Sequence, residues 1–239
     1  SEYWEALTAG KSGIGPIESF DASDLSVRIA GELKDFDPQS FFDRKELRKL
    51  DPFTIYHLVS SEEAIKNSGI DLDKTDGDRI GVIIGTGIGG IQTLENEHGV
   101  FSERGQRRVS PFFVPRFIPN IASGNLAIKF GLRGPNHTVI SACASGTDAI
   151  GCAMRTIQYG DADVMITGGT EASITGLTIS GFGNIKALST RNDDPTAASR
   201  PFDAERDGFV LGEGAAALVL EEEEHAKRRN APILAELAG

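Results

Sequence analysis

Cysteine is scarce in this chain of 239 residues, and long apolar runs are absent. The two cysteines, Cys143 and Cys152, are too few for a disulfide framework and lack the paired spacing of a metal site. Unpaired thiols persist in reducing compartments, so we expect a cytoplasmic protein. No apolar stretch approaches the ~20 residues that a membrane span needs, so we expect no membrane partner.

Basic residues are outnumbered by acidic ones, which argues against one class of partner. Lysine and arginine number 24 against 35 aspartate and glutamate residues, for a formal net charge of −11. We therefore expect no nucleic acid partner, because phosphate backbones attract basic surfaces. Basic residues still cluster at two places: Arg44, Lys45, Arg48 and Lys49, then Arg104, Arg107 and Arg108. Such runs are usually solvated faces, but in an acidic protein they can also steer an acidic partner.

Small residues surround Cys143 in the run Ser-Ala-Cys-Ala-Ser-Gly at 141–146. The β-branched residues before it predict a short buried strand at 138–141, and the apolar spacing after it predicts a helix at 145–159. A thiol at a helix N-terminus is favoured as thiolate by the peptide dipoles and free N–H groups. We interpret Cys143 as a nucleophile and Cys152 as a packing residue, with a buried structural cysteine as the alternative for Cys143.

Helical and strand patterns alternate along the chain, which predicts the α/β class. Asp51-Pro52 starts a helix that Ser68-Gly69 ends, and the run RIGVIIG at 79–85 predicts a buried strand. Further helices are predicted at 1–9, 118–130 and 222–229, and further strands at 162–168, 215–221 and 233–237. The glycine- and threonine-rich region 170–209 predicts loops around a short helix.

The segment GTGIGG at 85–90 follows a predicted strand and satisfies the G-x-G-x-x-G fingerprint of dinucleotide-binding folds. The fingerprint also requires a later strand that ends in an acidic residue, and the sequence offers only a poor substitute at 97–103. No Lys-Ser or Lys-Thr pair follows the glycines, so the segment is not a P-loop. Nucleotide binding is therefore the less favoured interpretation.

The run GPNHTVISACASGTDAI at 134–150 resembles the active-site signature of β-ketoacyl synthases. The segments SPFFVP at 110–115, ALSTRND at 187–193, RPFD at 200–203 and RDGFV at 206–210 agree with it. Together they resemble the β-ketoacyl-acyl-carrier-protein synthase II group of elongating condensing enzymes, in the thiolase superfamily. The resemblance implies an acyltransferase that elongates fatty acids by decarboxylative Claisen condensation of a cysteine-bound acyl chain with malonyl-carrier protein.

The resemblance also implies a fold, and it implies which part of the family's chain these residues form. Residues 1–239 would form the N-terminal β-ketoacyl synthase domain, shortened at both ends and without the second half. The fold would be α/β and thiolase-like: one βαβαβαββ half with a five-stranded mixed sheet between helices, whose first strand would precede residue 1. In the family, two histidines from the second half complete the site, one in a His-Gly-Thr and one in a Gly-His motif. His57, His98, His137 and His225 lie in neither context, so we interpret them as structural or surface residues.

By motif position, the resemblance implies the roles of further residues. The acyl pocket would include Ile88, Phe113 and Phe182, and Phe113 would reach toward the partner subunit of a homodimer. Acyl carrier protein would dock on Lys45, Arg48, Lys49, Arg107, Arg108 and Lys186. No metal or organic cofactor is expected, because the phosphopantetheine arm arrives with the carrier protein. Core aromatics and solvated basic faces remain the alternative interpretations.

Three other functions compete with the condensing enzyme. A cysteine hydrolase needs a histidine base held by a third residue, and no histidine here has a convincing context. A non-catalytic partner subunit, like the chain-length factors of polyketide synthases, lacks the nucleophilic cysteine, whereas Cys143 is present. The ketosynthase domain of a polyketide synthase is the nearest alternative within the family.

Overall fold

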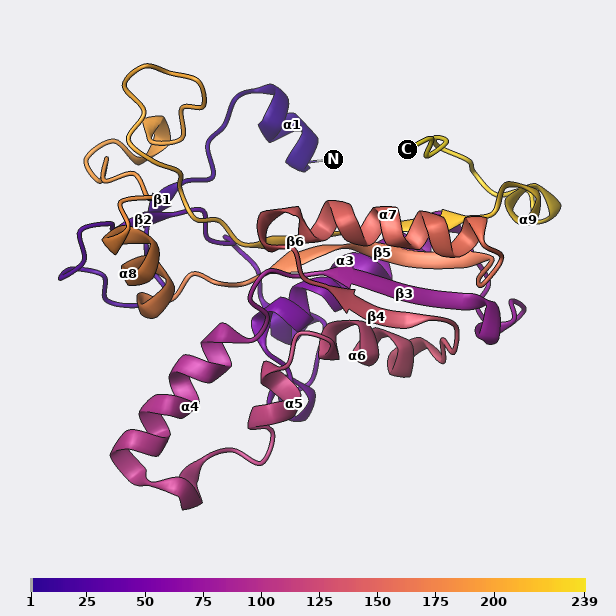
Figure 1. Cartoon of the computed structure of the whole chain (residues 1–239), viewed down its shortest axis with the longest axis horizontal. Helices are drawn as coiled ribbons and strands as arrows, with labels where there is room; N and C mark the ends of the chain where they lie inside the picture. Colours follow the sequence, from indigo (N-terminus) through magenta and orange to yellow (C-terminus); the bar gives the residue numbers. More distant parts are fainter. Residues whose placement is uncertain (1) are drawn as a thin grey trace. The chain divides into compact units, whose positions relative to one another are not determined.

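A mixed sheet of four strands forms the centre of the larger of two units in the computed structural model, which describes residues 2–239 (Figure 1). The larger unit, here called the sheet unit, comprises Asp37–Ala172 and Gly214–Gly239. The smaller, here called the loop unit, comprises Ser1–Phe36 and Ser173–Glu213. Among the described residues, no helix is both long and apolar enough to cross a membrane.

The strands of the sheet unit are β3 (Ile80–Gly85), β4 (Asn136–Val139), β5 (Val164–Glu171) and β6 (Gly214–Glu221), in the order β4-β3-β5-β6. β3 runs parallel to β4 and β5, and β6 runs antiparallel to β5. Gly85 pairs with Val139 on one side and Gly169 on the other. The carboxyl ends of the three parallel strands therefore meet at one edge of the sheet, here called the carboxyl edge.

The helices of the sheet unit are α2 (Arg44–Leu47), α3 (Pro52–Ser68), α4 (Ile91–Arg104), α5 (Phe113–Phe117), α6 (Ile121–Phe130), α7 (Ser145–Gln158) and α9 (Glu223–Arg228). Of these, α3 and α6 cover one face of the sheet and α7 the other, as the continuous apolar sequence of β3 requires. On one face, Ala149 of α7 packs with Ile83 and Met165. Phe53 of α3 packs with Ala122 of α6, and Figure 1 shows α6 and α7 on opposite sides of the sheet.

Most predicted elements of the sheet unit are confirmed. Asp51 caps α3 by accepting a hydrogen bond from the Phe53 N–H, and Gly69 ends the helix at a φ of 65°, a left-handed conformation that suits glycine. The fully buried Asp51 carboxylate also accepts hydrogen bonds from the N–H and the hydroxyl of Thr93, at 3.0 and 2.6 Å. The same residue therefore starts α3 and ties it to α4.

Two strand predictions need correction. The segment 233–237 is not a strand but an irregular, mostly exposed segment, because no neighbouring strand meets its backbone groups. The strand before Cys143 runs from Asn136 to Val139 rather than over 138–141, and it is exposed or half-buried instead of buried. The reason is its place at the edge of the sheet among the described strands. The fifth strand, expected before residue 1, stays a prediction.

The loop unit contains α1 (Glu2–Thr8), the antiparallel pair β1 (Gly15–Pro16) and β2 (Ile29–Ala30), and α8 (Gly176–Asn184). The helix predicted at 1–9 is thus confirmed for the described residues, and Ser1 lies outside them. The loops and short helix predicted at 170–209 are confirmed as well. Val27, Ile29 and Ile179 belong to the core of this unit.

Candidate active site

Cys143 lies at the junction between strand β4 and helix α7, at the carboxyl edge of the sheet. After β4 ends at Val139, the 3-10 turn Ala142–Ala144 leads directly into α7 at Ser145. The thiol of Cys143 is free and exposed, whereas Cys152 is half-buried on α7 beside the core. The strand-to-helix position predicted for Cys143 is therefore confirmed, and its role as the nucleophile stays a prediction.

A hydrogen-bonded clamp fixes the turn that carries Cys143. The hydroxyl of Ser145 accepts a hydrogen bond from the Ser141 N–H at 2.9 Å and donates one to the Ala142 carbonyl at 2.7 Å. Ala142 has a φ of 54°, in the left-handed region that costs a residue with a side chain some energy. The buried Ser145 hydroxyl thus holds a strained backbone that presents the thiol to solvent.

Glycines let the start of α7 lie directly against the sheet. A Cβ atom on Gly85 would overlap the backbone carbonyl of Ser145, and one on Gly169 would lie 3.1 Å from the Gly146 Cα. Both contacts are backbone against backbone, which only residues without a side chain permit at this distance. The helix N-terminus that carries Cys143 is therefore packed tightly onto the ends of β3 and β5.

The glycine-rich loop at 85–90 binds a carboxylate of the same chain. Glu171, the last residue of β5, accepts hydrogen bonds from the Gly87 N–H at 2.6 Å and the Ile88 N–H at 3.3 Å. The Thr86 hydroxyl donates a third at 3.3 Å. Burial raises the pKa of Glu171, against these hydrogen bonds from Gly87, Ile88 and Thr86, which lower it. The N–H groups that would hold a phosphate in a dinucleotide-binding loop are thus already occupied.

Glu171 is a site residue that its sequence context did not predict. The residue is a lone glutamate at the end of a strand, 84 positions from the Gly87 N–H that it binds, and no spacing pattern connects the two. The usable signal is its place: a carboxylate at the end of the strand that begins with the apolar run Val164–Ile166 must lie at the carboxyl edge.

The predicted acyl-pocket residues fall in both units. Ile88 lies in the glycine-rich loop and is 36% exposed. Phe113 begins α5 and stacks on Phe117, with ring centroids 5.8 Å apart. Phe182 lies on α8 in the loop unit, in an edge-to-face contact with Phe209 at 5.4 Å. The pocket that these residues would share stays a prediction.

The predicted docking residues are exposed and lie mostly in the sheet unit. Lys45, Arg48 and Lys49 lie on or just after α2, and Arg107 and Arg108 lie in the 3-10 turn Gln106–Arg108. The Lys49 Nζ is 5.9 Å from the centroid of the Phe112 ring, at the start of α5. The basic residues of α2 are thus next to Phe112, which follows the basic turn Gln106–Arg108 in the chain. Lys186 lies in the loop unit, after α8.

Of the four histidines, one is buried, two are exposed and one is bonded to a glutamate. His57 is buried in α3, with its Nδ1 3.1 Å from the Ser61 hydroxyl, and burial lowers its pKa to about 3. The imidazole of His57 is therefore neutral at physiological pH. His98 on α4 and His137 on β4 are exposed. His225 on α9 bonds to Glu221.

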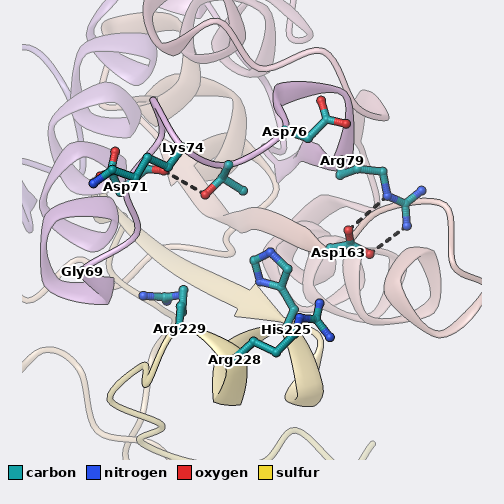
Figure 2. A pocket seen from close by; sticks show the side chains of 10 residues that line it. Gly69, Asp71, Lys74, Asp76, Arg79, Asp163, His225, Arg228 and Arg229 are labelled. Atoms are coloured by element: carbon teal, nitrogen blue, oxygen red, sulfur yellow. Dashed lines mark hydrogen bonds and ion pairs between the residues drawn. The ribbon is translucent and has the colours of Figure 1, made fainter.

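The opposite edge of the sheet carries a polar hollow of about 410 Å³ (Figure 2). Arg79 precedes β3 and Asp163 precedes β5, and this pair, 2.8 Å apart, lines the hollow. Lys74 pairs with Asp71 at 2.6 Å in the same wall. Since Cys143 follows the carboxyl end of β4, the hollow lies away from it, and its paired charges serve to join elements of the sheet unit.

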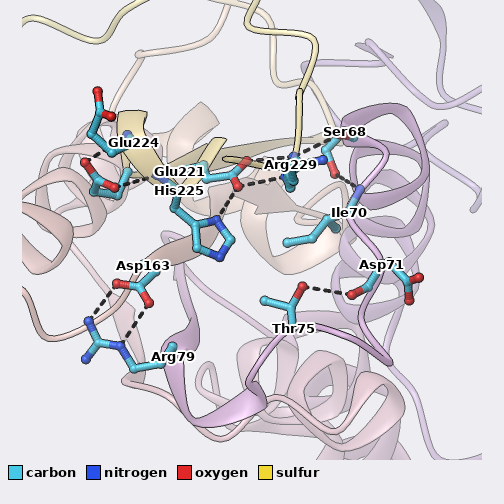
Figure 3. Close-up of polar contacts among 11 residues, drawn as sticks. Ser68, Ile70, Asp71, Thr75, Arg79, Asp163, Glu221, Glu224, His225 and Arg229 are labelled. Atoms are coloured by element: carbon cyan, nitrogen blue, oxygen red, sulfur yellow. Dashed lines mark hydrogen bonds and ion pairs between the residues drawn. The ribbon is translucent and has the colours of Figure 1, made fainter. Parts of the chain in front are cut away.

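Glu221 forms a separate group of ion pairs with His225 and Arg229, two residues that line the hollow (Figure 3). Its side chain is 8% exposed and accepts hydrogen bonds from Arg229 Nη2 at 2.6 Å and from the His225 ring. Arg229 also donates to the Ser68 carbonyl at the end of α3, at 3.0 Å. Burial opposes the charge of Glu221, but the hydrogen bonds from Arg229 and His225 outweigh it, so the pKa of Glu221 is lowered.

Glu221→Gln is expected to reduce the free energy of unfolding by about 2 kcal/mol at neutral pH, because a buried ion pair loses one partner. The lowered pKa of Glu221 means that its contribution is complete above the unfolded-state pKa and is lost as the pH falls through the folded-state value. Urea unfolding between neutral and acidic pH measures both effects. The control is Glu223→Gln, which removes an exposed pair with Lys227 within α9. Equal losses for the two variants would contradict the prediction.

The site and the fold together define an α/β protein of the thiolase-like class, with a cysteine at the N-terminus of a helix. The family described as "Beta-ketoacyl synthase, N-terminal domain" matches residues 1–226, and the chain belongs to this family. It is 51% identical over 239 residues to 3-oxoacyl-[acyl-carrier-protein] synthase 2 of Coxiella burnetii, covering 100% of this chain and 58% of that protein. The chain thus spans little more than half of that curated relative.

Solved structures agree with the family. A β-ketoacyl synthase from Burkholderia phymatum matches with a TM-score of 0.87 at 36% identity, over 97% of this chain and 57% of that one. A type II polyketide ketosynthase in complex with its acyl-carrier protein matches with a TM-score of 0.76 at 30% identity, over 95% of this chain and 66% of that one. The thiolase-like fold expected from the sequence is confirmed.

Proposed function

We propose that this chain is the N-terminal domain of a 3-oxoacyl-[acyl-carrier-protein] synthase that elongates fatty acids. The single observation that carries the proposal is the free, exposed thiol of Cys143 at the start of α7, on the carboxyl edge of the sheet. The similarity to a curated synthase of that name, over the whole chain, supports the same substrate class.

In the first half-reaction, the Cys143 thiolate attacks the thioester carbonyl of acyl-carrier protein. A carbon–sulfur bond forms at Sγ, the phosphopantetheine thiolate leaves, and the acyl chain remains on the cysteine. We expect the N–H group of Cys143, in the turn before α7, to stabilise the oxyanion of the tetrahedral intermediate. The exposed turn and its alanine neighbours leave space for the carrier's arm.

In the second half-reaction, malonyl-carrier protein loses CO₂, and the resulting carbanion attacks the acyl-cysteine carbonyl. A carbon–carbon bond forms, the Cys143 thiolate leaves, and the 3-oxoacyl group stays on the carrier. The four histidines of this chain lie on α3, α4, β4 and α9, and none lies in the His-Gly-Thr or Gly-His motif of the family. We therefore propose that groups outside these 239 residues stabilise the carbanion, so that this segment alone does not condense acyl and malonyl groups.

The experiment that tests the proposed function supplies the 239-residue protein with acyl-carrier protein and then malonyl-carrier protein. We expect an intact mass increased by one acyl group on Cys143, without CO₂ release or 3-oxoacyl product. Free fatty acid as the only product would favour a cysteine hydrolase instead. Condensation at the rate of an intact synthase would show that one of the four histidines acts after all.

The partners follow from the same proposal. Acyl carrier protein is the expected partner, supported by the similar ketosynthase that was solved with its own acyl-carrier protein. A homodimer, a cytoplasmic location and the absence of a metal or organic cofactor remain predictions from the sequence. In the described part of the chain, the exposed basic residues of α2 and of the turn Gln106–Arg108 are the surface that would attract an acidic carrier.

Reversing the charges of Lys45 and Lys49 to glutamate is expected to raise the KM for acyl-carrier protein about tenfold at low salt, with little change in the maximal acylation rate. Added salt should reduce the difference from the wild-type protein, because it screens the attraction. The measurement is the initial rate of Cys143 acylation against carrier concentration. Lys11→Glu with Lys66→Glu is the control for net charge. An unchanged KM at low salt would mean that the cluster is only a solvated face.

A further inference from the structure

Glu171 joins two segments that meet at the nucleophile. Its carboxylate is held at the carboxyl end of β5, whose last pair with β6 is Glu171 with Gly214. From there it accepts hydrogen bonds from Gly87, Ile88 and Thr86 of the glycine-rich loop. The Thr86 hydroxyl in turn accepts one from the Gly89 N–H at 3.3 Å. One side chain therefore organises four consecutive loop residues.

The same loop lies against the turn that carries Cys143. The Thr86 N–H donates to the Val139 carbonyl at 3.3 Å, which extends the β3–β4 pairing to the end of the strand. A Cβ atom on Gly87 would lie 2.7 Å from the Glu171 carboxylate and 3.6 Å from the Ala142 carbonyl. The Gly87 backbone thus lies close to both the Glu171 carboxylate and the turn that carries Cys143.

We propose that Glu171 is a positioning residue for acyl transfer: its carboxylate fixes the backbone of residues 86–89 beside the Cys143 turn, and thereby fixes where the side chain of Ile88 stands. The inference deepens the proposed function and rests on it, because Ile88 is an acyl-pocket residue only if Cys143 accepts acyl chains. Glu171 itself touches neither the thiol nor the substrate in this role.

The chemistry of the contact requires a carboxylate. Every group that points at Glu171 from the loop is a donor: the Gly87 and Ile88 N–H groups and the Thr86 hydroxyl. A carboxylate offers acceptors only, so both of its oxygens match. An amide would direct N–H donors at one of these positions and satisfy the loop in part, and a methyl group would leave the Gly87 and Ile88 N–H groups without this acceptor.

The expected consequence depends on the length of the acyl chain. A short chain occupies little more than the thiol's surroundings, whereas a long chain must follow the wall that includes Ile88. Movement of the loop by about 1 Å is enough to slow a reaction that depends on alignment by up to about a hundredfold. Loss of Glu171 should therefore affect long acyl chains more than short ones, and small alkylating reagents least.

The test compares Glu171→Gln and Glu171→Ala with the wild-type protein and with the control Glu62→Gln, an exposed glutamate on α3. The probes are the butanoyl and dodecanoyl thioesters of N-acetylcysteamine, with acylation of Cys143 followed by intact mass. Iodoacetamide labelling of Cys143 reports whether the thiol itself is intact. Thermal unfolding reports stability separately.

We expect Glu171→Ala to lower the ratio of dodecanoyl to butanoyl transfer about tenfold, Glu171→Gln to fall between it and the wild type, and Glu62→Gln to match the wild type. A lower melting temperature with an unchanged ratio in both variants would overturn the inference, because a purely structural role gives that result. If the wild-type thiol takes neither acyl group, the proposed function and this inference fail together. If it takes both and the ratio is unchanged, only the inference fails.

Discussion

Replacing Cys143 by serine is expected to lower the rate of acyl transfer from acyl-carrier protein by about a thousandfold or more. A thiolate is a far stronger nucleophile than a neutral hydroxyl at physiological pH, and the clamp of Ser145 around the turn supplies no base to activate a serine. The measurement is the rise in intact mass over time. Cys152→Ser serves as the control, because Cys152 is half-buried and packs against the core cluster that includes Ile83.

Selective alkylation tests the same assignment without a mutation. Limited iodoacetamide treatment, followed by peptide mass mapping, should label the exposed Cys143 first and the half-buried Cys152 only after unfolding. Preferential labelling of Cys152, or full acyl transfer in the Cys143→Ser variant, would contradict the assignment of the nucleophile.

The second large effect is expected from Gly85→Ala. The added Cβ would overlap the Ser145 carbonyl, a backbone atom that cannot rotate away, so the end of β3 and the start of α7 must separate. We expect the free energy of unfolding to fall by about 3 kcal/mol or more, and Cys143 acylation to fall with it. Urea unfolding and intact-mass acylation are the two measurements.

Gly151→Ala, a substitution within α7 itself, is the matched control. Gly151 lies inside that helix, and nothing stands within 4 Å of the added Cβ. Alanine there should leave acylation unchanged and stabilise the protein by about 0.5–1 kcal/mol, since glycine is the poorer helix residue. If Gly85→Ala were as stable as Gly151→Ala, the close approach of β3 and α7 would not be the constraint described above.

Local signals predicted most of the fold. The Asp51-Pro52 start and the Ser68-Gly69 end of α3 needed only capping rules, and the apolar run of β3 needed only its length. Predictions failed where an element depends on its neighbours. The segment 233–237 has no described strand beside it, and the residues before Cys143 lie at a sheet edge that no local pattern reveals.

The site was only partly predictable from the sequence. Cys143 was found because small residues, a strand end and a helix start coincide in one short segment. Glu171 was not, because its significance comes from the register of β5 beside β3, which pairs Gly169 with Gly85. Phe182 shows a further limit: its motif suggested a pocket role, but spacing along the chain does not give its place relative to Cys143.

The segments around Cys143 also determine when in folding the nucleophile is built. The Thr86 hydroxyl and the Glu171 carboxylate are 85 residues apart in sequence, and the start of α7 lies between them in the chain. Contacts of such long sequence separation form only after large loops have closed, which slows folding and gives a high contact order. The turn can be hydrogen-bonded locally through Ser145, but its surroundings exist only once β3, β4 and β5 have paired. A thiol with native reactivity at Cys143 therefore reports completed assembly of the sheet, not merely formation of helix α7.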